Sequence, residues 1–257
     1  MDAVALVPAA GRGVRLGAGV PKALVRVRGR SLLSRAVCGL LDSGSVSRVV
    51  VAAPADQLDP MTCEVREFGD RVHVVPGGGE RTDSVRAALE AADRLMPPLG
   101  AVLVHDAARA FTPARVIRDV VAAVEHGACA VVPTLPVADT VKRIDSEGVV
   151  AETVDRSLLR TVQTPQGFTA EVLREAYGAA EDAATDDAGL VERMGYPVKT
   201  VEGDTHALKV TTSFDLAIAE AVLAAEPTSA AELSAARSDV PVRSPGEADP
   251  GRNGDGS

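Results

Sequence analysis

Short apolar runs alternate with longer segments of helical periodicity along most of this chain. The apolar runs have the length of strands and are nearly continuous, which is typical of strands buried on both faces of a parallel sheet. They lie at residues 4–9, 48–54, 72–78, 101–108 and 128–134, with helical patterns at 31–44, 81–96 and 113–126. Strands that alternate with helices predict an α/β fold, so we expect a Rossmann-like, mostly parallel sheet covered by helices.

Two of the predicted helices carry capping signals. Ser31 stands at the N-cap of the helix over 31–44, and Gly44 follows its end. Ser213 stands at the N-cap of a closing helix over 213–225. A serine hydroxyl can accept a hydrogen bond from the first turn, and glycine suits the residue after a helix, so these residues mark the expected boundaries.

The regular alternation ends after Pro136. Residues 137–163 alternate between polar and apolar positions with a turn at 146–148, which predicts a β-arm that protrudes from the main sheet. Helical patterns at 169–182 and 186–194 and a strand at 196–203 follow. From Glu226 onward the chain is rich in Ala, Ser, Pro, Gly and scattered charges, and such a segment cannot offset the entropy of ordering. We predict one domain over 1–226, with the arm at about 137–163, and a disordered tail over 227–257.

Composition excludes several classes of function. The formal net charge of −9 argues against a nucleic-acid coat and a membrane-surface role, although cations gathered at one site could still hold an anionic substrate. No apolar stretch is long enough to span a bilayer. The cysteines Cys38, Cys63 and Cys129 form no CxxC pair, so neither a zinc site nor a disulfide framework is indicated, and a reduced cytoplasm fits best.

The glycine-rich stretch "LVPAAGRGVRLGAGVPKAL" follows the first predicted strand. Its glycines, Gly11, Gly13 and Gly17, are one residue too widely spaced for the dinucleotide fingerprint, and the second predicted strand ends without a carboxylate. An NAD(P)-dependent oxidoreductase is therefore disfavoured. The stretch does not match a Walker A loop either, because Lys22 follows a proline and is not followed by Ser or Thr.

Two interpretations of this loop remain. Its small residues let backbone N–H groups approach phosphates, and Arg15 and Lys22 can direct charge at a triphosphate and at the transition state. The alternative is a flexible surface loop with solvated cations. Asp106 favours the first interpretation, because it ends the fourth predicted strand, where ligands bind in open α/β sheets, and a carboxylate beside a triphosphate is a natural Mg²⁺ ligand. It could instead cap the following turn, and His105 is expected to be structural.

A set of eight segments resembles one enzyme family. In order they are "PAAGRGVRLGAGVPKAL", "GGGERTDSVRAAL", "VLVHDAAR", "DTVKRI", "TVDR", "TPQGF", "TDDAGLVE" and "LKVTTSFDLAIAEAVL". Together they resemble the 2-C-methyl-D-erythritol 4-phosphate cytidylyltransferases of the non-mevalonate isoprenoid pathway, over residues 2–225. The glycine loop alone is shared among many sugar nucleotidyltransferases, whereas the ordered set is much more specific.

The resemblance implies the transfer of a cytidylyl group from CTP to a polyol phosphate, with Mg²⁺ held by Asp106. It also implies a set of residues that hold the CTP phosphates, namely Ala9, Ala10, Gly11, Arg15 and Lys22. Of these, Arg15 and Lys22 would stabilise the pentavalent transition state. The residues implied to read the cytosine and contact the nucleoside are Gly78, Ser84 and Ala107.

The second substrate, methylerythritol phosphate, would be held by Arg109, Thr140, Arg156 and Lys209. The resemblance implies that Thr140 and Arg156 are lent by the neighbouring subunit of a homodimer through the arm. The chain departs from the family pattern at Gly79, where an acid is common, and at Ala207, where an Asn is common.

Three rival functions stay open at this point. The nearest is a cytidylyltransferase for another polyol phosphate such as ribitol 5-phosphate, since the contacts that separate acceptors are geometric. A nicotinamide-dependent oxidoreductase and a non-catalytic nucleotide-binding subunit are less favoured. An acceptor phosphate is already an anionic nucleophile, so the absence of a convincing catalytic histidine agrees with nucleotidyl transfer.

Overall fold

The computed structural model describes residues 3–10, 20–95, 98–180 and 186–225. The chain divides into two units, residues 1–220 and 221–257, and all of the sheet and the site below belong to the first. The described part of the second unit is the end of the last helix. The tail predicted over 227–257 lies outside the described residues and stays a prediction.

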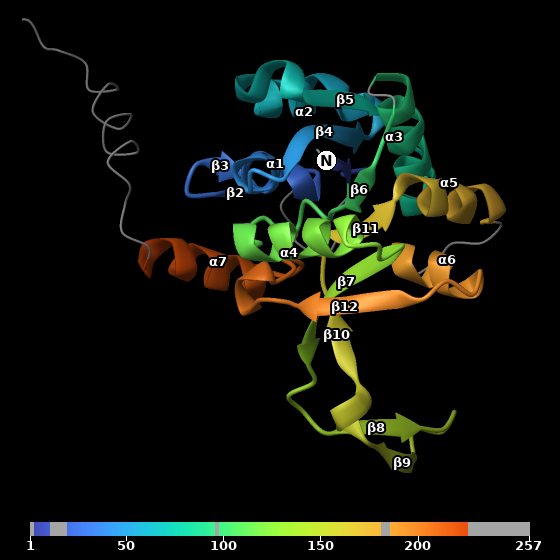
Figure 1. Ribbon diagram of the computed structural model, residues 1–257. Helices are drawn as coiled ribbons and strands as arrows, with labels where there is room; N and C mark the ends of the chain where they lie inside the picture. Colours follow the sequence, from blue (N-terminus) through green and yellow to red (C-terminus); the bar gives the residue numbers. More distant parts are fainter. Residues whose placement is uncertain (1–2, 11–19, 96–97, 181–185, 226–257) are drawn as a thin grey trace, which may run out of the picture. The chain divides into compact units, whose positions relative to one another are not determined.

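Within the described residues the main sheet has eight strands, seven of them in one row and one paired at the side (Figure 1). In spatial order the row is β10 (Arg160–Val162), β7 (Ala130–Pro136), β11 (Gln166–Thr169), β6 (Ala101–Val104), β1 (Ala3–Pro8), β4 (Val46–Ala53) and β5 (Val72–Pro76), and β12 (Val198–Glu202) pairs with β7. The pairs β6–β1, β1–β4, β4–β5 and β7–β12 are parallel, whereas β10 and β11 run antiparallel to their neighbours. The predicted mostly parallel sheet is confirmed.

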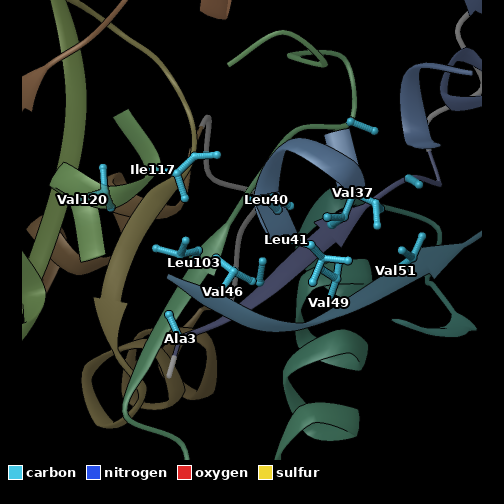
Figure 2. Packing of buried hydrophobic residues seen from close by; sticks show 14 of the residues in the cluster. Ala3, Val37, Leu40, Leu41, Val46, Val49, Val51, Leu103, Ile117 and Val120 are labelled. Carbon is cyan, nitrogen blue, oxygen red and sulfur yellow. The ribbon is translucent and has the colours of Figure 1, made fainter. Parts of the chain in front are cut away.

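Helices cover both faces of this sheet, because side chains alternate along each strand. Ala5 and Val7 of β1 belong to a core packed by helices on one face, and Val4 and Leu6 to a core packed on the other. The first face carries α1 (Leu32–Asp42), α2 (Leu58–Val65) and α4 (Ala114–Glu125), and the second carries α3 (Arg81–Leu95), α5 (Ala170–Ala179) and α6 (Asp187–Arg193). Figure 2 shows the first core, where Val37 and Leu40 of α1 lie over Val49 of β4.

Several elements were not predicted from the pattern. These are α2, the β11 strand, the small antiparallel pair β2 (Arg26–Val27) and β3 (Arg30–Ser31), and the short 3-10 helices η2 (Lys22–Leu24), η3 (Ala55–Gln57), η4 (Arg66–Arg71), η5 (Arg156–Leu158) and η6 (Thr205–Ala207). The closing helix α7 (Ser213–Ala225) begins where expected, but its cap is different. The Thr212 hydroxyl accepts a hydrogen bond from the Asp215 N–H, so Thr212 performs the role predicted for Ser213.

The predicted arm is present as a separate two-stranded sheet, β8 (Val141–Ile144) and β9 (Val150–Val154). Figure 1 shows this hairpin beyond the ends of β7 and β10. Residues 160–162, predicted as part of the arm, return to the main sheet as β10 and pair with β7. A role of the arm in dimerisation stays a prediction.

The order of the strands creates a switch point beside β1. From β1 the chain moves outward through β4 to β5, and α3 then carries it back to β6 on the other side of β1. The carboxyl ends of β1 and β6 therefore flank the position where ligands bind in open α/β sheets. Ala9 and Ala10 follow β1, and His105 and Asp106 follow β6, with the His105 N–H donating to the Leu6 carbonyl at 2.9 Å.

The N-cap of α1 offers a test of the fold. The Ser31 Oγ accepts a hydrogen bond from the Ser34 N–H at 3.1 Å, as predicted for a capping serine. Ser31→Ala should lower the free energy of unfolding by about 1 kcal/mol, because one amide of the first turn loses its acceptor in a buried position. Urea unfolding measures this loss. Ser31→Gly is the matched control, with an expected loss of only a few tenths of a kcal/mol, and equal losses would contradict the capping role.

Candidate functional site

The Asp106 carboxylate is the centre of a cluster drawn from distant parts of the sequence. Its Oδ2 lies 2.7 Å from the Lys209 Nζ, and its Oδ1 lies 3.6 Å from a terminal nitrogen of Arg81. The Asp106 side chain is 13% exposed, and its backbone N–H donates to the Thr164 hydroxyl at 3.0 Å. Because Asp106 follows β6, Arg81 begins α3 and Lys209 precedes α7, the fold brings both cations to the carboxyl end of a central strand.

Asp106 is ionised in this setting. Burial alone would raise the pKa of its carboxyl group, but the charges of Arg81 and Lys209 and the hydrogen bond from Lys209 outweigh burial and lower the pKa to about 2. The carboxylate is therefore negative throughout the neutral range. It is an oxygen ligand suited to a hard cation, and the interpretation of Asp106 as a mere turn cap does not account for its two cationic neighbours.

Arg81 was not singled out from the sequence, although it lies in the "GGGERTDSVRAAL" segment. Both of its terminal nitrogens donate to the Asp187 carboxylate, at 2.8 and 2.7 Å. The Tyr177 hydroxyl donates to the same carboxylate. Burial acts to lower the pKa of Arg81, but the hydrogen bonds and charge of Asp187 dominate and raise it, so the guanidinium stays charged. Asp187 also lies in a quoted segment, "TDDAGLVE", and its own side chain is fully buried.

His105 is structural, as the sequence indicated. Its ring is buried and its Nδ1 lies 3.1 Å from the Thr164 hydroxyl, which also accepts the Asp106 N–H. Burial lowers the pKa of His105 to about 4, so the imidazole is neutral at physiological pH. His105 thus helps to fix the backbone before Asp106 through Thr164.

Of the predicted base-reading residues, Gly78 lies in the loop between β5 and α3, and Ser84 lies in the first turn of α3. Ser84 is fully buried on α3, and its hydroxyl donates to the Glu80 carbonyl at 3.0 Å. A Cβ atom at Gly78 would lie 2.1 Å from the Cβ of Asp83, so only glycine fits there. At Gly79 a Cβ would meet nothing within 4 Å, so the loop has space for the acid that is common in the family. This departure therefore leaves the path of the loop intact.

The phosphate loop is described only at its two ends. Gly11 and Arg15 lie outside the described residues. Ala9 is buried, and its N–H donates to the Ala52 carbonyl at 2.8 Å, so that N–H is already paired within the sheet. Ala10 follows it, and Lys22 opens η2 at the other end.

Ala107 and Arg109 lie in the turn that follows Asp106. Ala107 is buried, with 5% of its surface exposed. The terminal nitrogens of Arg109 donate to the Ala207 carbonyl at 2.7 Å and to the Val162 carbonyl at 3.2 Å. Burial lowers the pKa of Arg109, with Asp106 acting in the opposite direction. Among the described residues its buried Nε finds no hydrogen-bond partner. Arg109 therefore joins the turn to both β10 and η6, and each terminal nitrogen keeps a second hydrogen for a ligand.

Thr140 and Arg156 belong to the arm. Both are exposed, and Arg156 donates a hydrogen bond to the Ala138 carbonyl. The hairpin of the arm is a sheet separate from the one that carries Asp106. The structure thus gathers Asp106, Arg109 and Lys209 in one place and sets the other two predicted acceptor residues on a different element.

In the described part of the chain, no three His, Cys, Asp or Glu side chains gather closely enough to hold a metal ion. Across the same ranges, no helix combines the length and apolar character needed to cross a membrane.

Comparison with known proteins gives a consistent result. Residues 3–225 match the family model described as "IspD: 2-C-methyl-D-erythritol 4-phosphate cytidylyltransferase". The chain is 70% identical over 224 residues to the 2-C-methyl-D-erythritol 4-phosphate cytidylyltransferase of Saccharopolyspora erythraea, covering 87% of this chain and 100% of the relative. It is 56% identical over 220 residues to the protein of the same name from Nocardia farcinica, covering 86% and 93%.

Solved structures agree with the sequence relatives. The crystal structure of the 2-C-methyl-D-erythritol 4-phosphate cytidylyltransferase from Thermus thermophilus matches with a TM-score of 0.71 and 39% identity, over 86% of this chain and 98% of that one. The 4-diphosphocytidyl-2C-methyl-D-erythritol synthase from Anaerococcus prevotii matches with a TM-score of 0.76 and 27% identity, over 87% and 98%.

Proposed function

The chain belongs to the 2-C-methyl-D-erythritol 4-phosphate cytidylyltransferase family, and we propose that the cluster around Asp106 is where its reaction takes place. The enzyme transfers the cytidylyl group of CTP to 2-C-methyl-D-erythritol 4-phosphate and releases pyrophosphate. The observation that supports the site is the ionised Asp106 between Lys209 and Arg81 at the strand switch point.

The residues suit the chemistry of this transfer. A phosphate oxygen of the polyol phosphate attacks the α-phosphorus of CTP, a new P–O bond forms, and the bond to the pyrophosphate leaving group breaks. The nucleophile is anionic at neutral pH, so no general base is required, which agrees with the neutral, buried His105. The barrier comes from bringing two anions together, and Arg15, Lys22 and Lys209 would lower it by neutralising and positioning them.

Magnesium would be held by Asp106 with oxygens of the CTP phosphates. The single carboxylate fits that ion, because Mg²⁺ is usually bound by one or two carboxylates plus substrate phosphates and water. When bound, the ion would neutralise phosphate charge and orient the triphosphate. Lys209 pairs with Asp106, and its side chain is 46% exposed on a flexible stem. Lys209 would therefore turn from Asp106 to the phosphate of the second substrate.

The acceptor would be held by residues of two subunits. Lys209 and Arg109 lie beside Asp106, and Thr140 and Arg156 would come from the arm of a second copy. The arm itself supports a homodimer. An isolated two-stranded hairpin is only marginally stable in water, so the arm is expected to pack against another surface. It also exposes large apolar side chains, with Leu158 at 84% and Ile144 at 59%. Such surface is stabilised by contact with a partner.

The remaining alternatives and the location follow from other observations. The relatives reported above are named for methylerythritol phosphate, so a ribitol phosphate cytidylyltransferase is not favoured. Family membership likewise argues against a nicotinamide-dependent oxidoreductase and a non-catalytic subunit. A cytoplasmic location is proposed because Cys38, Cys63 and Cys129 are all free thiols, as expected in a reducing compartment.

Nucleotide choice tests the base-reading loop. Pyrophosphate release should be fastest with CTP, and UTP, ATP and GTP should each be slower by about 10-fold or more. A wrong base leaves buried polar groups of the Gly78–Ser84 loop without partners, at a cost of about 1–3 kcal/mol each. The measurement is the initial rate of pyrophosphate release with each nucleotide and the methylerythritol phosphate acceptor.

The control for that assay uses unphosphorylated methylerythritol, which lacks the nucleophile and should give no release. Comparable rates with all four nucleotides would contradict the assignment of the loop to cytosine.

A further inference from the structure

The ion pair between Arg81 and Asp187 is unusual in its setting. Asp187 is fully buried at the start of α6, and Arg81 begins α3, so the pair joins two helices on one face of the sheet. The Tyr177 hydroxyl of α5 donates a third hydrogen bond to the Asp187 carboxylate, in addition to the two from Arg81. Burying two charges costs free energy that their attraction only partly offsets, so such a pair is weak evidence for a stabilising role.

The geometry around Arg81 points instead toward the site. One guanidinium nitrogen, Nη2, lies 2.7 Å from Asp187 Oδ2 and 3.6 Å from Asp106 Oδ1. The shorter contact is a hydrogen bond, whereas the longer one exceeds hydrogen-bond range and leaves a charge interaction. The carboxylates of Asp106 and Asp187 therefore compete for the guanidinium of Arg81. Both of its terminal nitrogens donate hydrogen bonds to Asp187.

We propose that Asp187 is a positioning residue that holds Arg81 away from Asp106, so that the Asp106 carboxylate keeps an oxygen free for the metal of the CTP complex. Arginine pairs with a carboxylate preferentially through two parallel hydrogen bonds. If Asp187 did not hold Arg81, the two terminal nitrogens of Arg81 would donate hydrogen bonds to Asp106 and occupy its oxygens. Held by Asp187, Arg81 contributes charge to Asp106 without covering it.

The other cation at Asp106 behaves differently. Lys209 is half exposed and reaches Asp106 from a segment between η6 and α7, so it can leave when a substrate phosphate offers a better partner. Arg81 is held by two hydrogen bonds to a fully buried carboxylate and has no comparable freedom of movement. Arg81 also begins the helix that carries Ser84, so the same ion pair sets the base-reading loop relative to the metal-binding carboxylate.

The inference rests on the proposed function of Asp106, and one binding experiment separates the two. Mn²⁺ binding is measured by electron paramagnetic resonance with the full chain and CTP, without the acceptor. Asp187→Asn should weaken Mn²⁺ binding about 10-fold, because residues that orient a metal ligand typically affect affinity by about 10–100-fold. If the unaltered chain with CTP binds no more Mn²⁺ than CTP alone, the metal role of Asp106 fails and the inference fails with it.

A second substitution distinguishes positioning from a loss of structure. The double variant Arg81→Met with Asp187→Asn removes the guanidinium that would close on Asp106, so Mn²⁺ affinity should return to within about 3-fold of the unaltered chain. Removing both charges would also relieve a merely structural pair, so positioning requires that Asp187→Asn weaken Mn²⁺ binding while its thermal unfolding stays close to that of the double variant. Unaltered Mn²⁺ affinity in Asp187→Asn, or a double variant as weak as the single one, would overturn the proposal.

Two further variants keep the experiment interpretable. Asp93→Asn is the matched control, since Asp93 forms a comparable fork with Arg174 on the exposed surface and should leave Mn²⁺ affinity unchanged. Tyr177→Phe removes one hydroxyl only and serves if Asp187→Asn does not fold. It should weaken Mn²⁺ binding by about 2- to 5-fold through a looser Asp187, and no change in that variant would also count against the proposal.

Discussion

Lys22→Ala is expected to lower kcat by about 10²–10³-fold and to leave the fold intact, because removing one preorganised donor from a developing charge has an effect of that size. The backbone around Lys22 is well fixed. Its carbonyl accepts from the Val25 N–H at 3.2 Å, and the adjacent Ala23 is buried in the core beside α1. This support fixes the point from which the Lys22 side chain reaches a phosphate. Steady-state kinetics with CTP and the acceptor measure the loss.

The matched control for this prediction is Lys199→Ala. Lys199 is an exposed lysine near the start of β12, so its loss changes the net charge by the same amount away from the switch point. Its kcat should stay near that of the unaltered chain, and circular dichroism checks folding in both variants. The same loss is expected for Arg15→Ala. Near-normal activity of Lys22→Ala would support the competing view of the loop as an ordinary surface turn.

Regular burial patterns identified the longer elements. The run over 48–54 became β4, in which nearly every residue is buried, and the pattern over 113–126 became α4, in which buried residues recur at helical spacing along one face. β11 was missed for the opposite reason. It has four residues, Gln166–Thr169, and its Gly167 is required by close packing, since a Cβ there would lie 2.5 Å from the Val120 side chain of α4. A strand this short carries no period that can be recognised.

The site divides in the same way. Asp106 was identified from its position after an apolar strand, which is a local signal. The partners that define its charge state are not local, because Arg81 begins α3 and Lys209 lies between η6 and α7. Arg81 is in turn paired with Asp187, 106 residues away in sequence, and nothing in either segment indicates that pair. Arg109 shows a related limit. The family resemblance implied a substrate contact, which stays a prediction, and the structure adds two hydrogen bonds to backbone carbonyls that a sequence pattern does not reveal.

Asp106→Ala and Arg156→Ala are each expected to be inactive alone and to recover activity when refolded together. In a two-fold dimer whose arms are exchanged, Arg156 serves the site of the partner subunit. A mixed dimer then has one site with both defects and one site with neither. About half of the dimers are mixed after random pairing, so the mixture should regain about a quarter of the unaltered activity.

The matched control mixes Asp106→Ala with Lys209→Ala. These two residues form an ion pair within one chain, so in any mixed dimer each site carries one defect and activity should not return. Sedimentation of each mixture confirms that dimers have formed. If the Arg156 mixture stays as inactive as the Lys209 mixture while both sediment as dimers, Arg156 acts within its own chain or not at all. The exposed apolar surface of the arm, including Leu158, would then require a different explanation from an exchanged active site.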